Sequence, residues 1–173
     1  METLKLKGII GFEPEDKTKK HKNQSSWKKV AMVFFDGDIC EYYAWFIMKR
    51  YNLVLNKPLR GAHISFINDS MKDLTFDNKR SVEEALNNWK TVKNKWHGKE
   101  IEVVLNLSPK TDDRSWWLNV SHEHRDGLQA IRDELGLGKP FYGLHMSIGY
   151  ANDKNIAHSE YIHGLIKNGF ITY

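Results

Sequence analysis

Two short segments of the sequence share a pattern of residue types that suits chemistry on a phosphate group. They are Gly61-Ala-His63-Ile-Ser65-Phe66 and Gly143-Leu-His145-Met-Ser147-Ile148. The two histidines are 82 residues apart. Because residues two apart in a β-strand project from the same face, each histidine shares a face with the serine of its own segment. Two such strands beside one groove would bring two imidazoles and two hydroxyls to a single phosphate.

The chemistry that this set of side chains supports is acid–base cleavage of a phosphodiester. Cleavage requires a proton to leave the attacking oxygen and another to reach the leaving oxygen, and histidine has its ordinary pKa near neutrality. We expect one of His63 and His145 to act as base, on water or on a 2′-hydroxyl, and the other as acid. Ser65 and Ser147 would donate hydrogen bonds to the non-bridging phosphate oxygens. Such a mechanism requires no metal and no cofactor.

Paired H-x-S/T motifs on strands about half a chain apart are the signature of the 2H phosphoesterases, and residues 28–150 resemble this LigT-like superfamily. The resemblance implies a bilobal α+β fold, with antiparallel sheets around a central cleft and helices on the outside. It also implies metal-free catalysis on nucleotide substrates. By motif match, the catalytic and phosphate-binding places of the family fall on His63, Ser65, His145 and Ser147. Many members have Thr where this chain has Ser, a difference that keeps the hydroxyl.

The choice of substrate is less constrained by the sequence. The family includes enzymes that act on 2′,3′-cyclic phosphate ends of RNA, on 2′,5′-oligoadenylates and on uridine tails, and phage proteins that degrade the cyclic oligonucleotide signals of bacterial immunity. The small size and the Lys- and Asn-rich composition favour a resemblance to these phage anti-CBASS members. One alternative is an RNA processing or repair enzyme. Others are a nucleotide- or RNA-binding module without catalysis and ordinary half-buried strands with no functional site.

Four residues near the motifs are weaker candidates for substrate contact. Arg60, three residues before the first histidine, could donate two hydrogen bonds to a phosphate, although an exposed salt bridge is an equal alternative. Trp116 and Trp117 project from opposite faces of one strand, and we expect Trp117 to be the stacking platform for a base. Tyr142 and Tyr150 flank the second motif and could line the cleft, although packing in the core is the commoner role of an aromatic residue.

Other catalytic classes find little support in the sequence. His122 and His124 are close in sequence, but residues two apart on a helix do not face each other, and no Cys, Asp or Glu pattern completes a zinc site. There is no phosphate-binding P-loop, no G-x-S-x-G elbow and no G-x-G-x-x-G fingerprint. The sequence therefore argues against a nucleoside triphosphatase and a serine hydrolase.

The elements that must position the two motifs alternate between strands and helices, which predicts an α+β fold. Strands are predicted at residues 3–12, 29–36, 59–68, 101–108, 115–121 and 143–150, and helices at residues 39–51, 81–96, 121–138 and 155–167. Asp38 is expected to cap the first helix, and Ser81 with Glu84 resembles a capping box for the second. The strands at residues 101–108 and 115–121 are expected to form a hairpin.

The overall composition is that of a globular domain. The 173 residues, 40% hydrophobic and 28% charged, predict one two-lobed domain with a full core. We expect the first lobe to span residues 28–108, the second residues 112–168, and a Lys-rich loop residues 13–29. The net charge of +4 favours an anionic partner, in keeping with a nucleotide substrate. No protein partner can be inferred from these features.

The expected location is the cytoplasm, which would be that of the host cell if the protein is encoded by a phage. The sequence has no apolar run of membrane-spanning length and no signal-peptide pattern at its start. Its single cysteine, Cys40, lies in an apolar segment and suits a reduced compartment. We therefore expect no interaction with a membrane.

Overall fold

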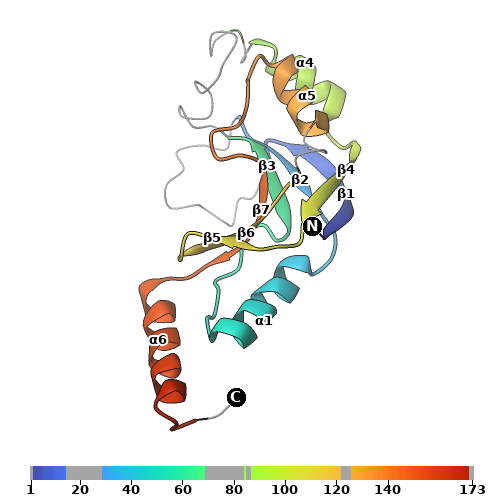
Figure 1. The fold of residues 1–173 in the computed structure, drawn as a ribbon. Helices are drawn as coiled ribbons and strands as arrows, with labels where there is room; N and C mark the ends of the chain where they lie inside the picture. Colours follow the sequence, from blue (N-terminus) through green and yellow to red (C-terminus); the bar gives the residue numbers. More distant parts are fainter. Residues whose placement is uncertain (1, 15–28, 69–83, 85–86, 122–125, 172–173) are drawn as a thin grey trace.

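A computed structural model of the protein describes residues 2–14, 29–68, 84, 87–121 and 126–171. The described part of the chain is an α+β fold with one seven-stranded sheet and four helices (Figure 1). The strands are β1 (Thr3–Phe12), β2 (Ala31–Phe34), β3 (His63–Ile67), β4 (Glu100–Asn106), β5 (Lys110–Thr111), β6 (Ser115–Asn119) and β7 (His145–Tyr150). The helices are α1 (Ile39–Tyr51), α4 (Trp89–Trp96), α5 (Asp126–Glu134) and α6 (Asp153–Lys167).

The sheet is antiparallel throughout and strongly curled. Its strand order is β4-β1-β2-β3-β7-β6-β5. The curl brings β4 back to the end of β6, where Leu105 and Val120 form an isolated bridge. The amide of Ser121 also donates to the carbonyl of Val104 at 2.7 Å. The sheet is therefore a half-barrel in which the edge strand β4 contacts the end of β6.

The two H-x-S segments meet at the centre of this sheet, because β3 and β7 are neighbours. β2, β1 and β4 lie on one side of this pair, and β6 and β5 lie on the other. The two predicted halves thus contribute to one shared sheet. β1, which precedes the predicted first lobe, belongs to the first side and pairs with both β2 and β4.

One face of the sheet carries the hydrophobic core. Along the strands, alternate residues point into it and are fully buried, among them Ile10, Val33, Ile64, Leu118 and Met146. Three helices add side chains to the same cluster: Cys40, Tyr43 and Ile47 from α1, Trp89 and Val92 from α4, and Leu128 and Ile131 from α5. The period of two on each strand therefore separates this core face from the opposite face, which carries the histidines.

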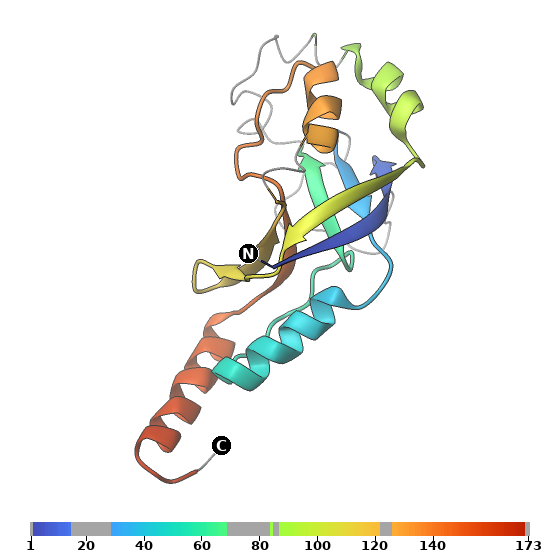
Figure 2. The same cartoon turned by 45° about the vertical axis from the view of Figure 1, so that its right-hand side comes forward.

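The helices lie at two ends of the sheet. Figures 1 and 2 show α4 and α5 together at one end and α1 and α6 at the other. At the first end, Lys95 and Trp96 donate to the carboxylate of Glu134, which joins α4 to α5. At the second end, Ser159 donates to the carbonyl of Tyr51, the last residue of α1. No residue of α6 is fully buried, although Ile156 is partly buried and packs against the core.

Most of the predicted helices are confirmed, with changes at their ends. The helix at residues 39–51 has the predicted bounds, but the side chain of Asp38 makes no capping hydrogen bond. The last helix begins two residues earlier than predicted, and Asn152 and Asn155 form its capping box. α4 occupies the end of the predicted helix at residues 81–96, and α5 ends at Glu134, four residues before the predicted end of its helix. The proposed cap at Ser81 lies outside the described residues.

The predicted hairpin between residues 101–108 and 115–121 is wrong for most of its length, because the two segments share only the isolated bridge Leu105–Val120 and the hydrogen bond from Ser121 to Val104. β4 pairs along its whole length with β1, while β6 pairs with β7 and with the short β5. β1 offers ten residues for pairing, and Lys5 and Lys7 form ion pairs across it with Glu102 and Glu100 at 3.3 and 3.0 Å. Complementary charges on neighbouring strands favour this partner over the nearer one in sequence.

None of the described helices is long and apolar enough to cross a membrane.

The close packing of β1 against β2 gives a test of the fold. A Cβ at Gly8 would lie 2.5 Å from a methyl of Val33 and 2.7 Å from the carbonyl oxygen of Phe34. We expect Gly8→Ala to lower the free energy of unfolding by about 1–3 kcal/mol in urea denaturation, because backbone must move to relieve the overlap. The matched control is Gly164→Ala on α6, where nothing lies within 4 Å of the new methyl. It should leave stability unchanged or raise it by up to about 1 kcal/mol. Equal stability of both variants would contradict the described packing.

Candidate active site

The four residues of the two H-x-S motifs lie together on one face of the central strand pair. Ile64 pairs with Met146, and both are fully buried on the core face. In an antiparallel pair with this register, His63 lies opposite Ser147 and Ser65 lies opposite His145. All four are half-buried and project from the other face, which we call the histidine face. The structure thus brings the four predicted catalytic residues together.

The spacing of antiparallel strands sets the size of this site. Directly opposite residues have Cβ atoms about 4.5–5.5 Å apart, and diagonal neighbours are about 7–8 Å apart. The two histidines are diagonal neighbours across β3 and β7, so their rings can reach a group placed between them from two sides. The two serines occupy the other diagonal. A tetrahedral phosphate fits such an arrangement, because each of its oxygens can be reached by a different side chain.

The backbone orients both imidazoles in the same way. Nδ1 of His63 lies 2.9 Å from the carbonyl oxygen of Gly61, and Nδ1 of His145 lies 3.3 Å from that of Gly143. A carbonyl only accepts, so Nδ1 must carry the proton and donate it in both contacts. In the neutral ring, Nε2 then holds the free lone pair that a general base requires. Each histidine is therefore held in the tautomer suited to proton transfer at Nε2.

The two glycines are needed for this orientation. Gly61 and Gly143 have φ angles of +67° and +71°, a region that residues with a Cβ rarely adopt. Each closes a four-residue turn, since its amide donates to the carbonyl of Pro58 at 3.4 Å or of Pro140 at 3.2 Å. The turn directs the glycine carbonyl toward the histidine two residues later.

The repeated segment is longer than the motif used in the sequence analysis. It includes Lys57-Pro58 before Gly61 and Lys139-Pro140 before Gly143, with the same separation of 82 residues. The neighbouring strands also match, because Phe35 donates to the carbonyl of Ala62 and Val120 to that of Leu144, both at 3.0 Å. The site therefore has approximate twofold symmetry. The repeated Lys-Pro dipeptide was a signal in the sequence that would have shown the full length of the repeat.

Burial lowers the pKa of both histidines below the ordinary value. Desolvation is the main cause for His63, and the positive charges of Arg60 and His145 lower its pKa further, against the contribution of the Gly61 carbonyl. For His145, desolvation is also the main cause, opposed by the Gly143 carbonyl. A nearby arginine charge thus acts on His63 alone. This makes His63 the better candidate for the neutral base in the free protein.

Trp117 lies on the histidine face, next to the second motif. It pairs with Ser147 across β6 and β7, and its ring centroid is 6.2 Å from that of His145 in an edge-to-face arrangement. Its indole N–H donates to the side chain of Asn119 at 3.0 Å, which fixes the ring. Trp116 packs instead against Tyr51, with 5.4 Å between ring centroids. The two tryptophans therefore lie on opposite faces of β6, and Trp117 is the one on the histidine face.

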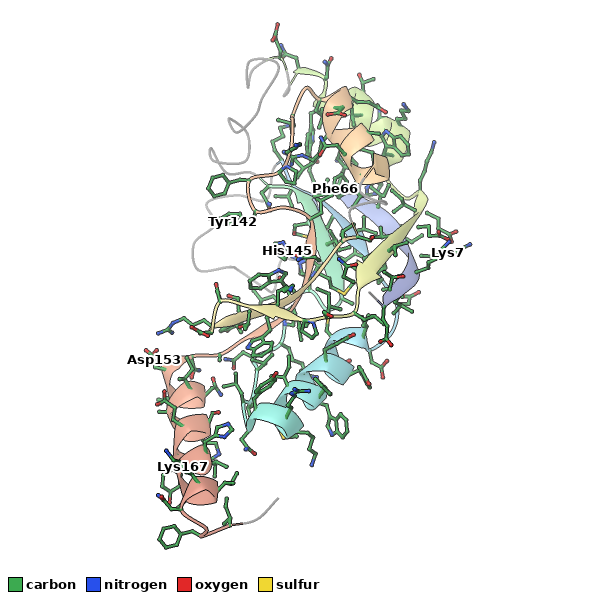
Figure 3. All side chains as sticks on the ribbon, viewed as in Figure 1. Lys7, Phe66, Tyr142, His145, Asp153 and Lys167 are labelled. Atoms are coloured by element: carbon green, nitrogen blue, oxygen red, sulfur yellow. The ribbon has the colours of Figure 1, made fainter. Side chains whose placement is uncertain are left out.

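The other three weaker candidates differ in position. Arg60 and Tyr142 occupy equivalent places in the two turns, and Arg60 contacts the carbonyl of Pro14 at 3.5 Å while its charge reaches His63. Tyr142 is 69% exposed, on the loop that leads to His145 (Figure 3). The register of β7 shifts after Ser147, so Tyr150 pairs with Ser115 and lies on the same face as Trp117 and Ser147, and its backbone also pairs with Asn56. Tyr150 thus remains on the histidine face, beyond Ser147 along β7, and its side chain is exposed.

Arg132 is a supporting residue that the sequence analysis missed. It is fully buried, and its guanidinium donates to the carbonyl of Phe66 at 2.7 Å and to that of Gly138 at 2.8 Å. Phe66 directly follows the serine of the first motif, and Gly138 precedes the turn of the second. One side chain of α5 therefore ties together the two segments that carry the motifs.

Cys40 supports the second motif from α1. Its thiol lies 3.4 Å from the carbonyl oxygen of Ser147, and burial raises the pKa of the thiol to about 11. The thiol is therefore neutral near pH 7 and serves as a small buried contact between α1 and β7.

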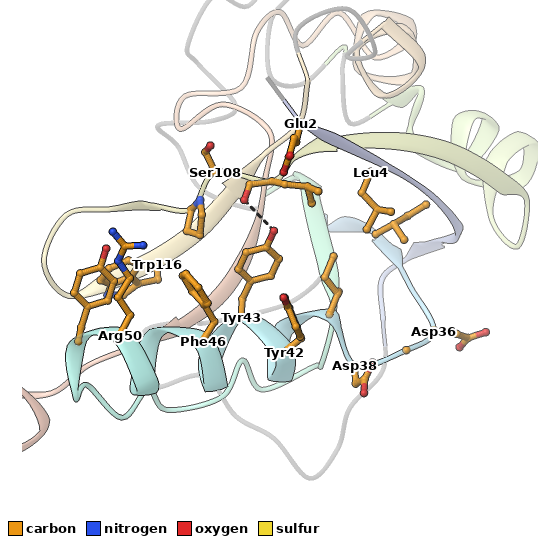
Figure 4. A pocket seen from close by; sticks show the side chains of 16 residues that line it. Glu2, Leu4, Asp36, Asp38, Tyr42, Tyr43, Phe46, Arg50, Ser108 and Trp116 are labelled. Atoms are coloured by element: carbon orange, nitrogen blue, oxygen red, sulfur yellow. Dashed lines mark hydrogen bonds between the residues drawn. The ribbon is translucent and has the colours of Figure 1, made fainter. Parts of the chain in front are cut away.

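A large cavity of about 840 Å³ lies away from the histidines, between α1 and the start of β1 (Figure 4). Its walls include the aromatic rings of Tyr42, Tyr43, Phe46, Tyr51 and Trp116. Its charged lining residues are Glu2, Asp36, Asp38 and Arg50. Three carboxylates against one guanidinium make this cavity unfavourable for a phosphate. Although it exceeds many ligand pockets in size, it lacks the proton-transfer groups of the histidine face.

Within the described ranges, no group of three or more His, Cys, Asp or Glu side chains is placed to hold a metal ion. His122 and His124 lie outside those ranges.

The chain was compared with protein-family models, with curated proteins and with solved structures, and none of the three comparisons gives a match.

The different surroundings of the two histidines can be tested by NMR titration of their ring protons. Both should titrate below the ordinary value of 6.5 because both are desolvated. Arg60→Gln should raise the pKa of His63, since it removes a positive charge that disfavours the imidazolium, and should leave that of His145 unchanged. Arg50→Gln, on α1, is the control and should move neither. Equal shifts of both histidines in Arg60→Gln would contradict the described asymmetry.

Proposed function

We propose that this protein is a phosphodiesterase of the 2H type, which cleaves its substrate by acid–base catalysis with His63 and His145. The observation that carries the proposal is the meeting of the two H-x-S motifs on neighbouring antiparallel strands, with both imidazoles held by equivalent glycine carbonyls. Two histidines with only a structural role in half-buried strands would not need to be held in the same orientation. The half-barrel, with one motif from each half of the chain at its centre, is compatible with a bilobal 2H fold.

In the proposed mechanism the phosphate lies between the two imidazoles. Nε2 of His63 takes the proton from the attacking oxygen, either water or a neighbouring 2′-hydroxyl, as this oxygen forms a bond to phosphorus. His145, protonated when the anionic substrate is bound, gives its Nε2 proton to the oxygen that leaves. Ser65 and Ser147 donate to the non-bridging oxygens, whose charge is redistributed in the transition state. His63 ends this step protonated and His145 ends it neutral, so the two histidines have exchanged their roles.

We propose cyclic oligonucleotide signals as the substrate, with the protein acting against bacterial defence in the cytoplasm of an infected cell. The support is the resemblance of the motifs and the small, Lys- and Asn-rich chain. Processing or repair of RNA ends that carry a 2′,3′-cyclic phosphate uses the same two histidines and is the main alternative. A module that binds nucleotides without cleaving them is the outcome to be expected if the protein retains affinity but shows no turnover.

The first test of the proposal is a chromatographic cleavage assay in the presence of EDTA. The substrates are 3′,3′-cGAMP, a cyclic trinucleotide, 2′,5′-oligoadenylate and an RNA with a 2′,3′-cyclic phosphate end. We expect cleavage that His63→Ala and His145→Ala each lower by roughly 10²–10⁴-fold, because each removes a proton-transfer group. The control is His158→Ala, an exposed histidine on α6, which should keep full activity. No turnover of any substrate by the wild type, or full activity of both site variants, would refute the enzyme.

The lowered pKa values predict the pH dependence of the reaction. The rate requires one neutral and one protonated histidine, so kcat/KM should follow a bell whose maximum lies between the two macroscopic pKa values. Both pKa values are lowered from 6.5 by desolvation, so the maximum should lie on the acidic side of pH 6.5. The negative charge of a bound diester raises both values, and the kcat profile should be displaced to higher pH. A kcat/KM that is flat from about pH 5 to 9 would contradict catalysis by two histidines.

A further inference from the structure

The histidine face has an aromatic side chain on each side of the four motif residues. Phe34 on β2 pairs with His63, which lies opposite Ser147, and Ser147 pairs with Trp117 on β6. Residues that face one another across neighbouring strands share a face, so these four form one row across the sheet. The row has an aromatic ring at each end and the polar groups in the middle.

Phe34 has a prepared position beside the first histidine. Its ring centroid is 6.3 Å from that of His63, with the two planes tilted by 35°. The ring lies over Gly11 of β1, because a Cβ at Gly11 would approach one of its edge carbons to 2.7 Å. The absence of a side chain at Gly11 allows the ring to lie against the sheet. Phe34 is half-buried in this position, so part of the ring remains accessible.

Phe34 thus mirrors Trp117 across the site. Each aromatic residue lies about one strand away from a histidine, on opposite sides of the β3–β7 pair. The four strands β2, β3, β7 and β6 span three intervals of about 4.8 Å, or roughly 14 Å in all. A phosphate at the centre of this span would have one aromatic ring on the side of each of its ester oxygens.

We propose that the site selects phosphodiesters that join two nucleosides, with the two bases turned away from each other and stacked on Phe34 and Trp117. This inference rests on the proposed function and defines its substrate class. Every base has a π-face, so stacking on aromatic side chains tolerates any base. A terminal 2′,3′-cyclic phosphate closes both ester bonds on one nucleoside and therefore uses only one of the two rings. The row accordingly favours internucleoside linkages, such as those of cyclic oligonucleotides, over RNA ends.

The test uses diesters that carry either two bases or one. The two-base substrate is the 3′,5′-linked diadenosine monophosphate, and the one-base substrates are adenosine 3′-methyl phosphate and adenosine 5′-methyl phosphate. Wild-type kcat/KM should be higher for the two-base diester than for each methyl ester by roughly 5- to 150-fold, the effect of one stacked base. Equal values for all three would overturn the proposal.

Variants of the two rings show which base each one holds. Phe34→Ala and Trp117→Ala should each lower kcat/KM for the two-base diester by roughly 5- to 150-fold. Phe34→Ala should lower kcat/KM for only one of the two methyl esters, and Trp117→Ala should lower kcat/KM for only the other. Phe34→Leu, which keeps an apolar side chain over Gly11 but no flat ring, should behave as Phe34→Ala. The control is Trp45→Ala, a 55% exposed tryptophan on α1, which should have no effect.

Two other outcomes are informative. Equal loss on all three substrates in Phe34→Ala would mean that the residue only supports the fold and would refute its role as a base platform. If the wild type cleaves no diester, the proposed catalysis fails, and the same substrates are then compared as ligands by isothermal titration calorimetry. Tighter binding of the two-base diester, lost in Phe34→Ala, would uphold the two platforms without the enzyme, and equal affinities would overturn both.

Discussion

Ile64 and Met146 face each other across the central strands, and the position of every polar group in the site follows from that pairing. Side chains on a strand alternate with a period of two, so the two apolar residues enter the core while their neighbours reach the other face. A slip of β7 by one residue against β3 would turn His145 and Ser147 into the core and expose Met146. The hydrophobic core therefore fixes the register, and the register assembles the site. Arg132 and Cys40 add hydrogen bonds that hold the two motif-bearing segments in place.

The two halves of the site are alike in backbone and different in side chains. In both, a Pro-x-x-Gly turn directs a carbonyl to Nδ1, and these main-chain contacts do not depend on the residues between proline and glycine. The turns differ where one has Arg60 and the other has the exposed Tyr142. The repeat thus supplies a symmetric scaffold for proton transfer, and the charge of Arg60 makes one side electrostatically distinct. This is how two similar histidines acquire different tendencies to hold a proton.

Local sequence patterns were sufficient to predict the α+β class, the bounds of α1 and the shared face of each His and Ser pair. They were insufficient wherever the answer depends on a distant partner. β4 pairs with β1, whose first residue precedes the first residue of β4 by 97 positions. The strand that follows β4 across the nearer turn is not its main partner. Phe34 was missed because its strand is apolar on both faces, and Arg132 because a charged helical residue is usually exposed. The face of Tyr150 could not be derived from its odd separation from His145, because the register shift of β7 interrupts the alternation after Ser147.

The central position of β7 has a consequence for how the molecule forms during synthesis. β1 to β4 are complete once residue 106 has been made, but until β7 arrives, β3 has an unpaired edge next to His63 and Ser65. An open edge of this kind is a template for pairing with another chain. Closing it requires contacts between residues about 80 positions apart, which are slow to form. We therefore expect the site to be among the last parts of the protein to form on the ribosome, and β3 to be the strand at greatest risk of aggregation before that step.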